Sequence, residues 1–187
     1  MKVLLVNGSP NKNGCTYTAL DEIKKTLAEE GIEADSFQLG KKPVGGCIAC
    51  YQCVSKGKCV FDDAVNEFTE LAKNYDGFIF GSPVYYSGMN GSLMSFMDRV
   101  FFSASSQEPH PFRYKPAAAV VSARRAGTTS AIDQINKYFL EQQEITEQML
   151  KILDDQENAT TSEILGCKES IKNFREAMKK QIPKWNS

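Results

Sequence analysis

The feature that most constrains the fold is a regular alternation of short apolar runs with segments of helical periodicity. The apolar runs, typical of buried strands, cover residues 2–7, 32–39, 77–81 and 117–121. Apolar residues at helical spacing follow the runs, over residues 16–30, from 65 to 72, over 91–102 and from 132 to 139. Strands that alternate with helices form parallel sheets with right-handed crossovers. The sequence therefore predicts an α/β fold, a doubly wound parallel sheet with helices on both faces.

Length and charge narrow the class of protein further. A chain of 187 residues suits a single domain, and 22 Lys and Arg against 23 Asp and Glu leave no basic excess for nucleic acid or an anionic membrane. The first apolar run is broken at Asn7 and Gly8, so it is too short for a signal peptide or a membrane span. We expect one cytoplasmic domain over residues 1–187 that binds neither nucleic acid nor membrane.

The last quarter of the chain departs from the alternation. Residues 141–163 are polar and helix-prone, and apolar residues at helical spacing return over 162–181. No run after residue 121 has the character of a strand. Residues 141–187 are therefore predicted to be an atypical helical segment, and a fifth strand is not visible.

The first loop at the expected carboxyl edge of the sheet follows the strand at residues 2–7. Ser9, Thr16 and Thr18 could donate hydroxyl groups to a phosphate, beside the free N–H groups at the start of the next helix. The loop lacks both the Walker A spacing and GxGxxG, which disfavours an ATPase. An ordinary turn with a capping threonine is the alternative.

Two further loops end at the same expected edge. Tyr85 and Tyr86 follow a buried strand and suit a flat aromatic ligand, although such a pair can also cap the core. Arg124 and Arg125 could neutralise an anionic ligand, or form a solvated basic turn. A phosphate cradle, an aromatic floor and a cationic edge together match the groups of flavin mononucleotide (FMN).

Four of the six cysteines fall within thirteen residues, in a Gly- and Cys-rich loop over residues 40–61. Their spacing is Cys47-x2-Cys50-x2-Cys53-x5-Cys59. Four thiolates on one loop can surround an iron–sulfur cluster, and Cys₄ sites also bind zinc. The remaining interpretation is that these cysteines are small buried apolar residues without metal.

The three loops together resemble the flavodoxin-like NAD(P)H-dependent FMN reductase family, and within it the iron–sulfur flavoproteins. The resemblance covers residue 1 to about 140, and it is carried by Val-Asn-Gly-Ser-Pro at 6–10 with Gly-Cys-Thr at 14–16, by Gly-Ser-Pro-Val-Tyr-Tyr at 81–86 with Phe-Met-Asp-Arg at 96–99, and by Val-Ser-Ala-Arg-Arg-Ala-Gly at 121–127. It implies the strand order 2-1-3-4-5, with the fifth strand the one that the sequence does not show.

The resemblance also implies which residues bind the cofactors. The FMN phosphate would lie among Ser9, Asn11, Cys15, Thr16, Tyr17 and Thr18, the isoalloxazine along Pro83, Val84, Tyr85 and Tyr86, and its pyrimidine end near Ser122, Arg124, Arg125 and Gly127. Cys15 stands where the family usually has Asn, so we expect weaker but retained FMN binding. Cys47, Cys50, Cys53 and Cys59 would hold a [4Fe–4S] cluster.

The function expected from this resemblance is FMN-dependent electron transfer, in which the flavin does the chemistry and no side chain acts as acid or base. Either NAD(P)H reduces FMN for a quinone-type acceptor, or ferredoxin supplies electrons through the cluster. A flavodoxin-like carrier and a zinc-stabilised binding module are the alternatives. The expected partners are a small molecule or a redox protein, and the expected assembly is a homo-oligomer, a dimer or tetramer.

Overall fold

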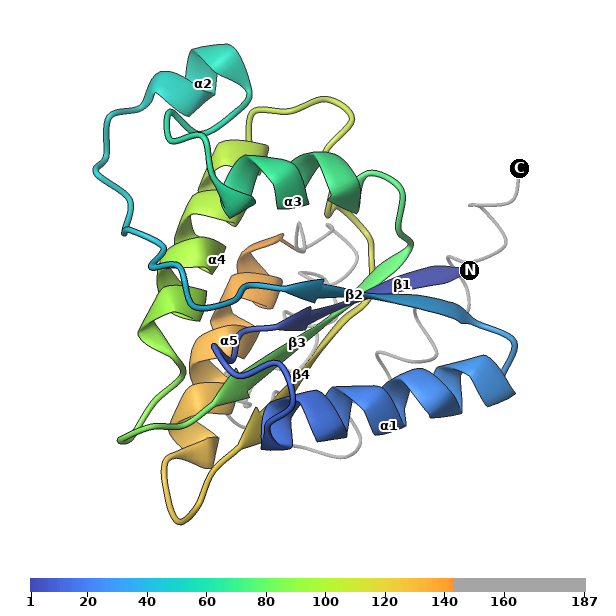
Figure 1. Ribbon diagram of the computed structural model, residues 1–187. Coiled ribbons are helices and arrows are strands. Elements are labelled where there is room, and N and C mark those ends of the chain that lie inside the picture. Colours follow the sequence, from blue (N-terminus) through green and yellow to red (C-terminus); the bar gives the residue numbers. More distant parts are fainter. Residues whose placement is uncertain (143–187) are drawn as a thin grey trace, which may run out of the picture. The chain divides into compact units, whose positions relative to one another are not determined.

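Four parallel strands form the centre of the protein. The computed structural model describes residues 1–142, and in it β1 (Lys2–Asn7), β2 (Glu33–Gln38), β3 (Gly77–Pro83) and β4 (Ala117–Ser122) pair in the order β2-β1-β3-β4 (Figure 1). All three pairings are parallel. The predicted fold and strand order are thus confirmed through the fourth strand. The doubtful fifth strand and nearly all of the helical segment predicted over 141–187 lie outside the described residues.

Helices cover both faces of the sheet, because alternate residues of each strand point to opposite faces. Val3 and Leu5 of β1 are buried with Leu20 of α1 (Cys15–Glu29). Leu4 and Val6 face the other way, into a larger core built with α3 (Ala64–Ala72), α4 (Gly91–Ala104) and α5 (Thr128–Gln142). In Figure 1, α1 accordingly lies on one side of the sheet and these three helices on the other.

Aromatic rings fill the larger core. Phe68 of α3 is fully buried, and its ring lies within 6.1 Å of five other rings, centroid to centroid, those of Phe37, Phe78, Phe80, Phe96 and Phe112. Burial of one such side chain contributes about 2 kcal/mol or more. This core joins α3 and α4 firmly to the sheet, so the loops that they support have a rigid base.

The helix starts are fixed by polar residues that the sequence provides. The Asp63 carboxylate accepts a hydrogen bond from the N–H of Val65 and so caps α3. The Asn90 side chain caps α4 in the same way, through the N–H of Ser92. Gly14 precedes α1 and provides no side-chain cap.

The cysteine-rich loop contains an element that periodicity did not predict. A short helix, α2 (Gln52–Lys56), lies within it, flanked by Tyr51 and Gly57 in the left-handed region. Two side chains from outside the loop hold it in place. The Ser106 hydroxyl donates to the Cys53 carbonyl at 2.9 Å, and the Gln107 side-chain amide donates at 2.5 Å to the carbonyl of Gly57, which follows the helix. A five-residue helix is too short to leave a periodic pattern in the sequence, and its stability comes from these tertiary contacts.

Among the described helices, none is both long enough and apolar enough to cross a membrane.

Candidate functional site

The three predicted ligand loops are joined directly to one another at the carboxyl edge of the sheet. The Gly8 N–H donates to the Gly81 carbonyl at 2.8 Å, which links the first loop to the second. The hydroxyl groups of Thr16 and Ser122 lie 2.8 Å apart, which links the first loop to the third. The sheet thus brings the three predicted groups of residues together in one place, as parallel strands do.

The first loop is held in shape by its own side chains and by β2. Ser9 is buried, its N–H donates to the Asn7 side-chain oxygen, and its hydroxyl accepts from the N–H of Asn11. Its carbonyl accepts from the Gln38 amide at 2.7 Å, and Gln38 in turn bonds Asn7. Sequence reasoning missed Asn7 and Gln38, although each is an amide at or next to the end of a predicted strand, which was the signal available.

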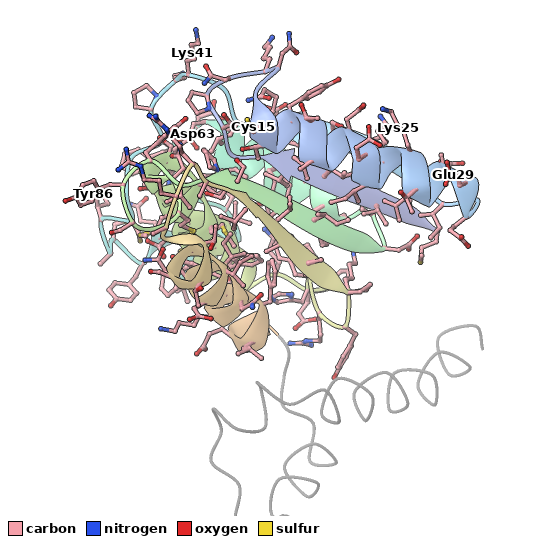
Figure 2. All side chains as sticks on the ribbon, turned by 90° about the horizontal axis from the view of Figure 1, so that it is seen from below. Cys15, Lys25, Glu29, Lys41, Asp63 and Tyr86 are labelled. Carbon is pink, nitrogen blue, oxygen red and sulfur yellow. The ribbon has the colours of Figure 1, made fainter. Side chains whose placement is uncertain are left out.

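The start of α1 offers backbone donors for an anion. The first N–H groups of a helix lack partners within it. Gly14 is the N-cap residue of α1, and no side chain among the described residues caps this helix start. Cys15, Tyr17 and Thr18 are exposed around this helix start, while Thr16 is buried (Figure 2 labels Cys15). No threonine caps this helix, because Thr18 donates to the Gly14 carbonyl and Thr16 pairs with Ser122.

The second loop exposes its aromatic rings. The strand extends to Pro83, two residues beyond the predicted end, and Val84 and Met89 then form a bridge that closes the loop. The Tyr85 side chain is 62% exposed and that of Tyr86 96% exposed, and Figure 2 shows Tyr86 projecting from the protein. The alternative interpretation, in which the two rings cap the core, is therefore wrong.

The third loop packs closely against the second. Gly127 has φ +92°, and a Cβ there would lie 2.8 Å from Val84 Cγ1 and 2.9 Å from the Ser87 backbone. The Ser122 carbonyl accepts the Val84 N–H at 2.8 Å. Arg124 and Arg125 are exposed, and neither takes part in an ion pair within the described residues. Two guanidinium groups thus remain available on this loop.

The four clustered cysteines share one cavity. Its enclosed volume is about 20 Å³, and besides the four cysteines it is lined by apolar side chains, Arg99 and Ser103. Cys47 and Cys50 are exposed, Cys53 is buried and Cys59 is partly buried. Burial raises the pKa of the Cys53 thiol. The structure thus places the four cysteines around one cavity.

Two of the four sulfurs already accept N–H groups. Cys47 Sγ accepts from the backbone N–H of Ala49 at 3.4 Å. Cys59 Sγ accepts from Nε and Nη2 of Arg99, each at 3.3 Å. Donors of this kind surround sulfur ligands in iron–sulfur proteins. In the part of the chain that the structure describes, however, no three Cys, His, Asp or Glu side chains are close enough to hold a metal ion.

The backbone of the cysteine loop carries local strain. Ala49 and Tyr51, on either side of Cys50, have φ of 51° and 54°. Side-chain-bearing residues adopt this left-handed region at a cost of about 1 kcal/mol each. Strain of this kind is concentrated where loops bind ligands. The donor set of four thiols on one loop suits a cluster by its chemistry, and in this structure the thiols do not converge on one point.

The fold and the loops define a class of protein, a flavodoxin-like α/β protein with a ligand edge suited to a flavin nucleotide. Solved structures share this fold: a flavone reductase (TM-score 0.61, 16% identity, 76% of this chain and 50% of that one) and an NAD(P)H:quinone oxidoreductase of Methanothermobacter marburgensis (TM-score 0.53, 17% identity, 80% and 75%). At these identities the likeness shows the fold alone. The chain spans half the length of the flavone reductase.

Sequence comparison goes further than the fold. The profile of the NADPH-dependent FMN reductase family matches residues 1–152. An iron-sulfur flavoprotein of Methanocaldococcus jannaschii is 38% identical over 142 residues, 75% of this chain and 72% of the relative. Another, from Clostridioides difficile, is 32% identical over 144 residues, 75% and 62%. The chain therefore belongs to the NADPH-dependent FMN reductase family and is an FMN-dependent oxidoreductase.

Proposed function

We propose that this protein is an FMN-dependent oxidoreductase that also carries a [4Fe–4S] cluster on Cys47, Cys50, Cys53 and Cys59. The observation that carries the proposal is the shared cavity of these four cysteines, on a loop of a flavin-reductase fold. When bound, FMN would supply hydride or one-electron chemistry and the cluster one-electron chemistry. Relatives named iron-sulfur flavoproteins support the same proposal.

The three loops at the carboxyl edge would hold FMN. Ser9, Asn11 and residues 15–18 would bind the phosphate, because a helix start attracts anions; the N–H of Thr18 already bonds the Gly14 carbonyl, so the backbone donors would come from residues 15–17. Pro83, Val84, Tyr85 and Tyr86 would lie along the ring. Ser122 and Gly127 shape the adjoining turn, and Arg124 and Arg125 would stabilise negative charge on the reduced flavin.

The electron donor favoured by the structure is a small redox protein such as a ferredoxin. Apolar side chains are exposed around the cysteines, with Ile48, Tyr51 and Val54 each at least 60% exposed. A patch of this kind allows a protein partner to dock close to the thiols. NAD(P)H is the second candidate donor, and the names of the solved flavoenzyme structures favour it. Quinone-type molecules are the proposed acceptors in either case.

An anaerobic absorption spectrum with metal analysis tests the proposal. Protein purified without oxygen and reconstituted with iron, sulfide and FMN is expected to hold four iron and four sulfide per chain, as a cubane does, with one FMN. Cys53→Ser is the test variant, because it removes one proposed ligand. Cys167→Ser is the matched control, because it removes a cysteine outside the cluster spacing. One zinc without sulfide, or FMN without iron after reconstitution, would contradict the cluster.

The choice of donor is tested separately on the same preparation. A protein-fed enzyme reduces its FMN with reduced ferredoxin much faster than with NADH or NADPH, measured by loss of flavin absorbance. The opposite order assigns NAD(P)H as the donor, and slow reduction by all of them indicates the carrier function instead.

Location and assembly complete the proposal. We propose a cytoplasmic protein, because a reducing compartment keeps clustered thiols available for metal. We also propose a homo-oligomer, a dimer or tetramer, and light scattering coupled to gel filtration measures the mass that decides it.

A further inference from the structure

We propose that Arg99 is a positioning residue that raises the reduction potential of the cluster in the cysteine loop, with Asp63 acting against it. The inference rests on the proposed function, because it concerns the potential of the proposed cluster. The Arg99–Asp63 ion pair lies outside the cysteine motif, and we infer that it helps to set the reduction potential of the site.

Arg99 is fully engaged toward the cysteine loop. Its side chain is 1% exposed, and every one of its nitrogens has a hydrogen-bond partner. Nε and Nη2 both donate to Cys59 Sγ, Nη1 donates to the Gly45 carbonyl at 3.2 Å, and Nη1 and Nη2 together bind the Asp63 carboxylate at 2.8 and 2.9 Å. The guanidinium fork thus reaches one cysteine sulfur with two N–H groups.

The same side chain joins the two ends of the loop. Gly45 lies just before Cys47, and Cys59 is the last of the four cysteines. The ring of Phe61, two residues further on, lies 4.8 Å from the guanidinium carbon. Figure 1 shows α4, which carries Arg99, running toward α2 of this loop. One cation therefore holds the start and the end of the cysteine segment against a rigid helix.

The pair places a cation at the sulfur and a carboxylate behind it. The Arg99 guanidinium is a cation at neutral pH, as arginine side chains in proteins are, and it donates to both the Asp63 carboxylate and Cys59 Sγ. Asp63 is less buried, with a side chain 22% exposed. The positive end of the pair is thus the one shielded from water and in contact with the sulfur.

The sign of the effect follows from charge. One-electron reduction adds negative charge to a cluster and its sulfur ligands, and it breaks no bond and moves no proton. N–H donors and positive charge at a ligand sulfur stabilise that reduced state, which raises the potential. The Asp63 carboxylate opposes it. Removing the Arg99 donors should therefore lower the potential, and neutralising Asp63 should raise it.

Redox titration of the reconstituted holoprotein, followed by electron paramagnetic resonance, tests this sign. R99K keeps the charge but lacks the planar fork that reaches Cys59 and Asp63 together. We expect the ratio of reduced to oxidised cluster at a fixed ambient potential to fall about tenfold, equivalent to about 59 mV for a one-electron couple. D63N keeps an oxygen for the Val65 N–H, and we expect it to shift the potential the other way.

Lys56→Gln serves as the matched control, because it removes an exposed cation of α2 that bonds only Gln52 among the described residues. Screened by solvent, it should leave the potential unchanged. If R99K fails to retain iron, the potential of D63N alone tests the inference. An ion pair with only a structural role would give no positive shift of the cluster potential when Asp63 is neutralised. If R99K and D63N hold as much iron as the wild-type protein and their cluster potentials are unchanged, the inference is wrong and the proposed function still stands. Absence of iron from the wild-type protein overturns the proposed function and the inference with it.

Discussion

At the scale of single residues, Gly127 is the position where the smallest change should do most harm to the ligand edge. In Gly127→Ala, φ of +92° strains the backbone, and the new Cβ would meet Val84 and the Ser87 backbone within 3.0 Å. We expect a loss of about 2 kcal/mol in the free energy of unfolding, and weaker FMN binding, measured by urea denaturation and flavin fluorescence. Gly91→Ala, which meets nothing within 4 Å, should cost nothing, and equal losses in both variants would contradict this account.

The hydroxyl pair of Thr16 and Ser122 is the second residue-scale test. Thr16→Val removes a buried hydroxyl of similar shape and leaves Ser122 without this partner, so we expect a loss of about 1 kcal/mol of stability. Combining it with Ser122→Ala should cost less than the sum of the two single changes, with a coupling of about 1 kcal/mol in a double-mutant cycle. Thr18→Val, at an exposed position, is the control. Additive losses would show that the hydrogen bond does not join the loops.

At the scale of elements, the docking of α5 on α4 depends on Tyr138, which donates to Asp98 and stacks on Phe101. Burial and then the hydrogen bond to Asp98 raise the pKa of Tyr138 above its usual value of 10.0. A raised pKa means that this contribution to stability is complete below about pH 10 and is lost as pH rises toward the folded value. Tyr138→Phe should therefore be less stable by about 1 kcal/mol at pH 7, with a smaller difference above pH 10.

Urea unfolding at both pH values measures this change, with Tyr86→Phe as the control because that ring is almost fully exposed. A difference between wild type and Tyr138→Phe that stays constant with pH would contradict the assignment.

The elements also show what the sequence could and could not predict. Strands and long helices repeat an apolar pattern, so residues 2–7 and 91–102 were placed within two residues of β1 and α4. The loops gathered as predicted because parallel strands end at one edge. α2 and the Arg99 pair were missed, since both depend on residues far away in the sequence: Arg99 on Asp63, 36 positions away, and α2 on Ser106, 53 positions from Cys53. An arginine on the apolar side of α4, three residues after Phe96, was the signal present.

At the scale of the whole molecule, the flavin fold should be independent of the cysteine loop. The large core is built from the sheet, α3, α4 and α5, and of the four cysteines only Cys59 packs against it. Replacing all four cysteines by serine should therefore leave FMN binding intact and lower Tm by no more than about 5 °C, measured by calorimetry with and without FMN. Cys15→Ser is the control. Unfolding of the quadruple variant would favour the zinc-stabilised alternative.

Helix α4 has one more consequence. Asn90 at its start accepts the hydrogen bond of the cap and donates its own N–H to Ser82 of the flavin edge, and Arg99 grips the cysteine loop nine residues later. At a rise of 1.5 Å per residue, these two anchors lie about 13 Å apart along one rigid axis. With FMN at the edge of Ser82 and a cluster in the cysteine loop, as proposed, the length of this one helix would set the separation of the two cofactors. A residue inserted between Asn90 and Arg99 would lengthen that separation and rotate one anchor away from the other.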